Sequence, residues 1–292
     1  MKSIRFGVVI TLTIIGVGTS AFAVPIYVVD DYRFPWGGYS SKIVVMDSEA
    51  PHNETILNAG TGKKMTDIAI TPSGSRLYTI TSDGGVALYR YDVDDGHLLN
   101  SWNLGIGGTG TGYKNALVAE SETSLLLMSN DKTNLWRINL DAATGNYSST
   151  SNLGNIGLYS SGDLAISPDG VLYLSSVDLP NSLTAKNRLY KIDLSGSPVA
   201  TQIGIIHVGP NPLTQIYGLA FDENGVLYGG RGAVGVAEDV YTISLLNASA
   251  TFGWTMQCVP PTGINGFASV PEPATIALLG LGVLALLRKR KA

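Results

Sequence analysis

A repeat of about 48 residues constrains the fold of this chain more than any other feature of its sequence. Its clearest copy spans residues 162–194 and begins with a short apolar run, residues 164–167, followed by the turn sequence Pro168-Asp169-Gly170. Residues 171–174 are apolar at every position, as expected for a strand covered on both faces. Residues 189–194 then alternate between apolar and polar side chains. The unit therefore predicts three consecutive β-strands.

The same unit recurs along the chain at a nearly constant step. Its first strand begins at Asp67, Asn115, Asp163, Gly218 and Gly266, which are separated by 48, 48, 55 and 48 residues. A third strand also recurs, and a more polar fourth strand follows it. Four strands in about 48 residues make one blade of a β-propeller. We therefore expect an all-β propeller of about five four-stranded blades; a β-sandwich, the structural alternative, would not explain the constant step.

The lengths of the connections divide the predicted propeller into two faces. Connections between the first and second strands and between the third and fourth strands are tight turns, whereas the others are long. The two classes emerge on opposite sides, named here the tight-turn face and the long-loop face. We expect the tight-turn face to be strongly negative and the long-loop face near neutral. The acidic residues assigned to tight turns are Asp47, Glu49, Glu54, Asp92, Asp94, Asp95, Glu120, Glu122, Asp141, Asp169, Asp193, Asp222 and Glu223.

The two ends of the predicted ring complete each other. Residues 26–57 supply only three strands, so the first blade lacks an innermost strand and would leave a free sheet edge. Residues 266–270 provide that strand, and we expect Phe267 to pair with Val28. An innermost strand runs from the long-loop face to the tight-turn face. The C-terminal segment should therefore leave the ring from the tight-turn face.

The chain begins with a segment that has the pattern of a secretory signal peptide. Lys2 and Arg5 precede an apolar run over residues 6–17, and Ala21-Phe22-Ala23 forms a small-residue cleavage site. We expect cleavage after Ala23, and a signal helix before it. The domain prediction is a signal peptide at 1–23, a propeller at 24–269 and a C-terminal tail at 270–292.

The tail combines a short motif, an apolar stretch and a basic end. Val270, Pro271, Glu272 and Pro273 come first, and the apolar residues 274–287 follow. A helix of 14 residues would reach about 21 Å against a hydrocarbon core of about 30 Å, so it is a marginal transmembrane helix. Arg288, Lys289 and Arg290 would stay on the cytoplasmic side. A plain membrane anchor is the alternative interpretation of this segment.

This order of Pro-Glu-Pro, apolar helix and terminal basic cluster closely resembles the PEP-CTERM sorting tail of Gram-negative bacteria. The resemblance implies processing near Pro271-Glu272-Pro273 by a membrane transpeptidase, an exosortase. It also implies export by an organism that makes exopolysaccharide, with the chain anchored in the inner membrane before sorting and then placed at the cell surface or in the extracellular matrix. The repeated units resemble quinoprotein-like and YVTN-type propellers, a resemblance that implies the fold and no activity.

Charge and cysteine content exclude some partners. Removing Lys2, Arg5 and the four terminal bases from the 19 cations leaves 13, and removing Glu272 from the 23 acids leaves 22, so the core carries a net charge of −9. A strongly acidic core argues against a nucleic-acid partner. Cys258 is the single cysteine, so neither an intrachain disulfide nor a cysteine-based metal site is possible, and we expect a buried inert thiol.

No motif in the sequence predicts catalysis, a metal or a cofactor. Residues 105–110 satisfy G-x-G-x-x-G, but a predicted strand follows them where a dinucleotide site needs a helix. Asp47, Asp92, Asp141 and Asp193 each end a third strand, which favours capping of the following turn over calcium binding. The sequence has only three histidines, His52, His97 and His207, and none of them lies in a pattern that predicts a metal site or a catalytic base. We therefore expect a protein that is not an enzyme.

The long-loop face carries the candidate ligand-binding residues. Aromatic and basic side chains interleave there, which suits a neutral or anionic polysaccharide through stacking and charge-assisted hydrogen bonds. The candidates are Arg33, Trp36, Tyr39, Lys64, Tyr113, Lys114, Arg188, Tyr217 and Arg231. Ordinary surface loops are the simpler interpretation. The functional prediction is an exported envelope or matrix protein associated with exopolysaccharide or another surface protein, with a sugar or lactone hydrolase or lyase, or an interaction scaffold, as alternatives.

Overall fold

The computed structural model describes residues 24–33, 39–81, 85–106, 114–129, 133–179, 184–232, 238–257 and 263–269. Every regular element in this part of the chain is a β-strand. None of the described residues forms a helix long and apolar enough to cross a membrane. The expected signal segment, Cys258 and residues 270–292 lie outside the described residues.

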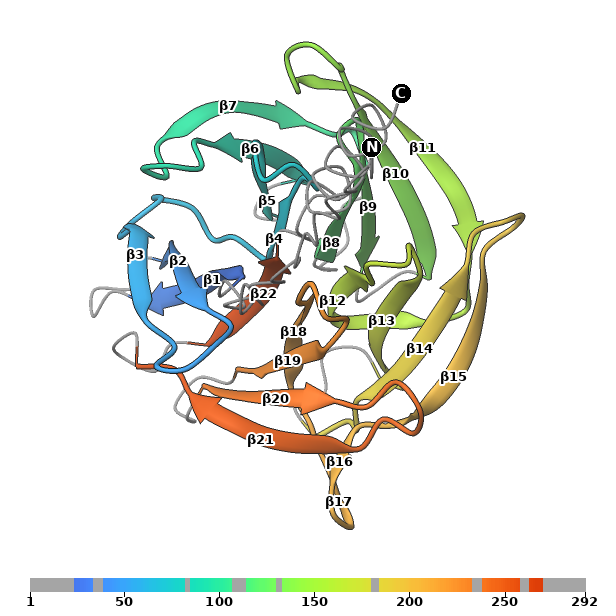
Figure 1. Ribbon diagram of the computed structural model, residues 1–292. Helices are drawn as coiled ribbons and strands as arrows, with labels where there is room; N and C mark the ends of the chain where they lie inside the picture. The colour runs from blue at the N-terminus through green and yellow to red at the C-terminus, as the bar shows by residue number, and fades with distance from the viewer. Residues whose placement is uncertain are drawn as a thin grey trace, which may run out of the picture.

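Five four-stranded antiparallel sheets surround a central axis, with the first strand of each at the centre (Figure 1). Blade 1 contains β22 (Ile264–Ser269), β1 (Pro25–Arg33), β2 (Tyr39–Asp47) and β3 (Glu54–Asn58). Blade 2 contains β4 (Asp67–Ile70), β5 (Leu77–Thr81), β6 (Ala87–Tyr91) and β7 (Leu98–Asn103). Blade 3 contains β8 (Lys114–Ser121), β9 (Ser124–Ser129), β10 (Asn134–Leu140) and β11 (Tyr147–Asn155).

Blade 4 contains β12 (Tyr159–Ile166), β13 (Leu172–Val177), β14 (Arg188–Asp193) and β15 (Val199–Ile205). Blade 5 contains β18 (Ile216–Phe221), β19 (Leu227–Arg231), β20 (Asp239–Ile243) and β21 (Ala250–Thr255). The expectation of five blades is confirmed. A two-stranded hairpin, β16 (His207–Val208) and β17 (Asn211–Pro212), lies between blades 4 and 5 and accounts for the one repeat step of 55 residues.

The C-terminal strand closes the ring by completing blade 1. β22 pairs with β1 in antiparallel register, and Val28 lies opposite Phe267 as predicted. Ser269, the last residue of β22, lies near the turns that follow the other innermost strands, because it lines the same pocket as Pro72 and Pro168. The chain therefore leaves the ring on the tight-turn face, as expected from the strand direction.

The hydrophobic core is divided among the five seams between neighbouring blades. Each of the five buried clusters in the described residues draws side chains from two adjacent blades. In β9, for example, Leu125 and Leu127 pack toward blade 2, whereas Leu126 packs toward blade 4. Second strands are therefore apolar at every position because both of their faces are covered. Leu77, Leu126, Leu172 and Leu227 are all buried, which confirms the repeat register.

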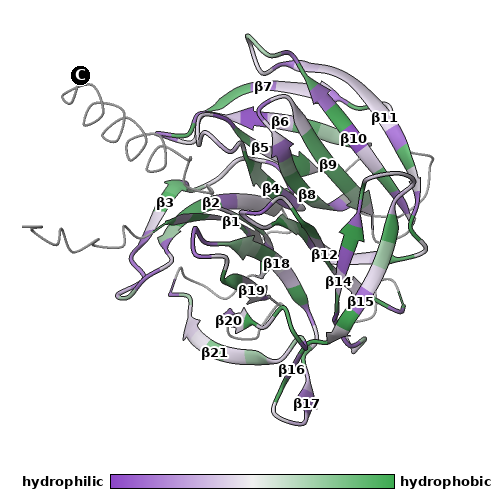
Figure 2. Cartoon of the chain, turned by 45° about the vertical axis from the view of Figure 1, so that its right-hand side comes forward, coloured by the Kyte–Doolittle hydropathy of each residue, from purple (hydrophilic) through white to green (hydrophobic). Residues whose placement is uncertain are grey.

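Polarity increases from the axis to the rim. In Figure 2 much of β4, β8 and β18 is coloured as hydrophobic, whereas the outermost strands β11 and β21 are mostly pale. Residues of β7 and β11 are largely exposed. This gradient follows from the blade geometry, because an outermost strand faces solvent along one edge.

The tight turns are fixed by aspartate side chains as predicted. Asp92, Asp141 and Asp193 each accept a hydrogen bond from a backbone N–H two or three residues later, at 2.8 Å in each case. Asp47 differs, since its carboxylate accepts from the side chain of Asn53. All the acidic residues assigned to tight turns lie in or next to those turns. Asp30, Asp67, Asp163 and Glu238, outside the tight turns, are buried, as is Asp222 within one of the turns.

Candidate functional site

Two aspartates at the axis bind one backbone amide from each of the five innermost strands. Asp67 starts β4 and Asp163 lies in β12, and both side chains are 0% exposed. The carboxyl of Asp67 accepts from the N–H groups of Ile68 and Leu117. Asp163 accepts from Leu164 and Leu219, both at 2.6 Å, and from Phe267 at 3.0 Å. The five donors belong to β4, β8, β12, β18 and β22.

The two carboxyls are hydrogen-bonded to each other, which requires a proton on one of them. Burial raises the pKa of both Asp67 and Asp163 well above the ordinary range, and the nearby charge of Asp163 raises the pKa of Asp67 further. Asp163 accepts three amides and Asp67 accepts two, so the negative charge is better stabilised on Asp163. Asp67 therefore carries the proton and donates it to Asp163.

Two other blades have glycine at the equivalent position, and one of these glycines, Gly266, leaves room for the pair. Gly218 and Gly266 occupy the repeat positions that correspond to Asp67 and Asp163. A Cβ on Gly266 would overlap the Asp67 carboxyl, and a Cβ on Gly218 would press on the ring of Phe267. Side chains at all five positions would not fit around the axis.

A proton shared by two carboxyls is a chemistry that some hydrolases use, but here it is inaccessible to a substrate. Both side chains are completely buried, and their oxygens are occupied by amides and by each other. A general acid or base must reach the proton it transfers to or from a substrate. The arrangement is therefore suited to holding the innermost strands together.

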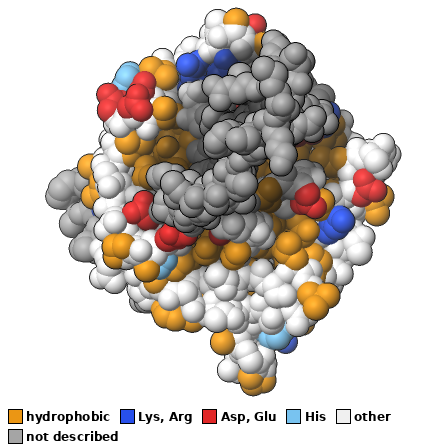
Figure 3. Space-filling model, in the orientation of Figure 1, with side chains coloured by type: hydrophobic (Ala, Val, Ile, Leu, Met, Phe, Trp, Pro, Cys, Tyr) orange, Lys and Arg blue, Asp and Glu red, His pale blue; other side chains and the backbone are white. Residues whose placement is uncertain are grey.

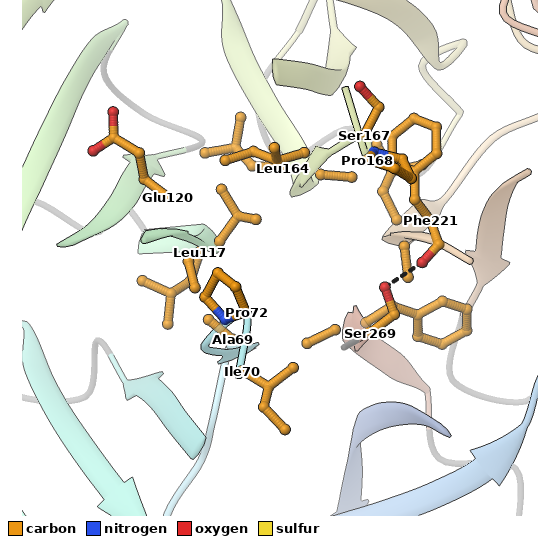
Figure 4. A pocket seen from close by; sticks show the side chains of 18 of the residues that line it. Ala69, Ile70, Pro72, Leu117, Glu120, Leu164, Ser167, Pro168, Phe221 and Ser269 are labelled. Carbon is orange, nitrogen blue, oxygen red and sulfur yellow. Dashed lines mark hydrogen bonds between the residues drawn. The ribbon is translucent and has the colours of Figure 1, made fainter. Parts of the chain in front are cut away.

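An apolar pocket of about 210 Å³ lies at the tight-turn end of the axis. Figure 4 shows Ala69, Leu117, Leu164 and Phe221 around it, from four different blades, with Ser269 donating a hydrogen bond to the carbonyl of Phe221. Leu117, Leu164, Leu219 and Phe267, whose amides bind the axial carboxyls, also line this pocket. The carboxyl pair thus lies beyond the inner end of an apolar depression.

The structure brings three of the predicted ligand-binding residues to the same end of blades 4 and 5. Asn187, next to Arg188, is buried; it accepts a hydrogen bond from the N–H of Ile216 and donates one to the Ile216 carbonyl. Ile216 precedes Tyr217 and pairs with Arg231 across the sheet. Arg188 forms an ion pair with Asp178, so its charge is already partly neutralised.

The other predicted residues lie elsewhere on the ring or outside the described part. Arg33 and Tyr39 are paired at the end of the β1–β2 ladder, and Lys64 lies in the connection from blade 1 to blade 2. Lys114 begins β8 in blade 3. Trp36, Tyr113 and all of the sorting-motif residues lie outside the described residues. The predicted binding set is thus divided among separate blades.

One exposed turn holds the single group of possible metal ligands found in the described residues. The ligand atoms of Asp92, Asp95 and His97 lie within 4.8 Å of one another. Hydrogen bonding to His97 lowers the pKa of Asp95, and the hydrogen bond to Asp95 raises the pKa of His97. These contacts are those of the capped β6–β7 turn, which accounts for the cluster without an ion. The other histidines lie apart, with His52 stacked on Trp254 at 3.7 Å.

Charge on the visible surface is sparse. In Figure 3 the acidic side chains form small separate groups, and most of the surface is uncharged or hydrophobic. This agrees with a chain in which only 14% of residues are charged. No large charged field marks a ligand site on the part of this face that is described.

Comparison with known proteins identifies the end of the chain and the fold of its body. Residues 269–291 match the family model of the PEP-CTERM protein-sorting motif. The chain is thus an exported five-bladed propeller that carries a sorting signal of Gram-negative bacteria. No curated protein matches it.

Solved structures resemble the body of the chain at low sequence identity. A protein of unknown function from Bacteroides thetaiotaomicron is 19% identical with a TM-score of 0.52, over 80% of this chain and 59% of that one. TolB from Acinetobacter baumannii is 14% identical with a TM-score of 0.47, over 86% of this chain and 62% of TolB. An α-L-arabinofuranosidase from Clostridium thermocellum is 11% identical with a TM-score of 0.47, over 81% of this chain and 95% of that one. The chain spans about three fifths of the first two, and the likeness concerns the fold alone.

Proposed function

We propose that this chain is a non-catalytic propeller of the cell envelope or extracellular matrix, processed by an exosortase-type membrane transpeptidase, with a long-loop face that contacts exopolysaccharide. The observation that carries this proposal is the position of the sorting motif. Its match begins at Ser269, the last residue of the strand that closes the ring. The whole described domain is therefore the cargo that the motif delivers.

The direction of the closing strand supports the assignment of the binding face. β22 ends on the tight-turn face, so that face lies toward the membrane before the chain is sorted. The long-loop face then points outward, where a matrix polymer can reach it. Arg188, Tyr217 and Arg231 lie on that outward side at neighbouring blades.

The sorting part of the proposal is tested with the full chain in a Gram-negative host, with and without a matching exosortase. We expect a mature form lacking the tail, detected by mass spectrometry, only when the enzyme is present. Replacing Pro271, Glu272 and Pro273 together by Ala should leave the precursor in the membrane fraction. A processed product in the absence of the enzyme would contradict the proposal.

The binding part is tested by co-sedimentation of the mature protein with exopolysaccharide from a producing strain. We expect Tyr217→Ala combined with Arg231→Ala to weaken binding by about tenfold, since loss of a stacking and a charge-assisted contact removes about 1.4 kcal/mol. Lys191→Ala, an exposed base in the middle of β14, is the matched control and should bind as the unaltered protein does. If the double variant binds exopolysaccharide as strongly as the Lys191→Ala control does, the part of the long-loop face around Tyr217 and Arg231 is not the binding site.

A further inference from the structure

The sorting motif follows the closed ring without a linker. β22 ends at Ser269, which lines the axial pocket, and its hydroxyl donates to the carbonyl of Phe221 in blade 5 (Figure 4). The match to the sorting motif begins at this same residue. The start of the motif is thus held against the tight-turn face.

The number of residues beyond Ser269 sets how far the motif extends from that face. Residues 270–273 precede the apolar stretch that begins at Ala274. Four extended residues span at most about 14 Å. A membrane enzyme that processes the chain near Pro271-Glu272-Pro273 therefore works within this distance of the tight-turn face.

The enzyme could process the motif at a greater distance from the tight-turn face only if β22 were pulled out of the ring. The structure opposes this, because Ile264 and Phe267 are buried in the seam between blades 5 and 1. β22 also pairs with β1 from Ile26 to Asp30, and the Phe267 N–H binds Asp163 at the axis. Withdrawal would break all of these contacts together. The closed ring is therefore the form that the enzyme encounters.

We propose that the tight-turn face around the axial pocket is the docking surface for the membrane-embedded sorting enzyme, an inference that rests on the proposed function. Pro72 and Pro168 at the pocket and Val226 in the β18–β19 turn provide apolar contact. Glu120 and Asp169 lie beside them. A partner that fits this surface presents an apolar patch bordered by cationic side chains.

The test measures the rate at which the full chain is processed when it is expressed with the enzyme. Pro168→Lys combined with Val226→Lys places two cations on the proposed surface. We expect processing to slow by about threefold to tenfold, because like charges at an interface rim reduce association. Leu179→Lys is the matched control, an exposed apolar residue that follows β13 on the long-loop face, and its processing rate should not change.

A spacer distinguishes docking from other effects of these substitutions. Inserting about twelve Gly and Ser residues between Ser269 and Val270 frees the motif from the ring. We expect the double variant with the spacer to be processed as fast as the unaltered chain with the spacer. A loss that persists with the spacer would indicate contact with the bilayer or a folding defect, and would overturn the proposal.

Two further outcomes also decide against docking. The proposal is wrong if the double variant is processed at the unaltered rate, or if Phe267→Ala, which weakens β22, accelerates processing, because the enzyme would then act on an opened ring. If the unaltered chain is not processed although the enzyme is active on another substrate, the proposed function itself fails, and docking fails with it. If the unaltered chain is processed and the double variant is processed at the same rate, the docking surface is wrong but the proposed function still holds.

Discussion

At the residue scale, the axial aspartates solve a problem that every small propeller has. The innermost strand of each blade has a partner on one side only, so its inner N–H groups need acceptors other than a neighbouring strand. Asp67 and Asp163 provide acceptors to all five strands at once. Burying two carboxyls is costly, and the shared proton limits that cost to a single charge.

The two aspartates should not respond equally to amide substitution. Asp163→Asn would turn an N–H₂ group toward amide donors, and we expect it to lower the free energy of unfolding by about 3–5 kcal/mol. Asp67→Asn keeps a donor to Asp163 and loses one acceptor, so we expect about 1–2 kcal/mol. Denaturant unfolding of the two variants measures both values. The reverse order would place the proton on Asp163.

The shared proton also predicts a pH dependence of stability. The pKa of Asp67 is raised in the folded state, so the folded chain binds more protons than the unfolded chain above the ordinary value of 3.8. Its contribution is complete below pH 3.8 and is lost as the pH rises toward the raised pKa, with a slope of at most about 1.4 kcal/mol per pH unit. Unfolding experiments from pH 4 upward should show a pH dependence in the unaltered protein that is weaker in Asp67→Asn, where only Asp163 keeps a raised pKa. Parallel curves would contradict the assignment.

At the element scale, the second strand of each blade packs against the neighbouring blades on both of its faces. Leu126 is buried in the seam with blade 4, while its neighbours in β9 face blade 2. We expect Leu126→Ala to cost about 2–5 kcal/mol, since the rigid seam leaves a cavity. Leu179→Ala, 64% exposed, should change stability by no more than about 0.5 kcal/mol. Thermal and denaturant unfolding compare the two; similar effects would mean that the seams repack freely.

The strand pattern could be predicted because it depends on local periodicity and on turn residues that repeat. The β16–β17 hairpin was not predicted: Gly209-Pro210 is a turn signal, but two-residue strands are too short to show an alternating pattern. The axial pair had a visible signal, since Asp67 and Asp163 occupy the same position in alternate repeats. Their contact, however, depends on the number of blades: in a wider ring the same residues would lie too far apart to share a proton. Likewise, topology predicted the end of the blades at which Arg188, Tyr217 and Arg231 lie, but the separation of the predicted binding residues among blades depends on the arrangement in space.

At the scale of the whole molecule, the ring is closed by one short strand that also carries the exit to the sorting motif. β22 joins the two ends of the described chain through its ladder with β1. The neighbouring blade is adapted to it, because Gly218 and Gly230 leave space for the ring of Phe267. Closure and the presentation of the motif therefore depend on the same few residues.

Truncating Phe267 should therefore lower the stability of the whole ring and loosen its closing blade. Its side chain is 1% exposed, and we expect Phe267→Ala to lower the free energy of unfolding by about 3–5 kcal/mol. Because β22 seals the inner edge of blade 1, amide hydrogen exchange should accelerate together in β1 and β22, and less in blade 3. Phe252→Ala is the matched control, since Phe252 is 52% exposed on the outermost strand of blade 5, and it should leave both measurements nearly unchanged. Uniform acceleration across all five blades would show that the seam does not open separately from the rest of the ring, and that closure is a property of all blades rather than of this strand.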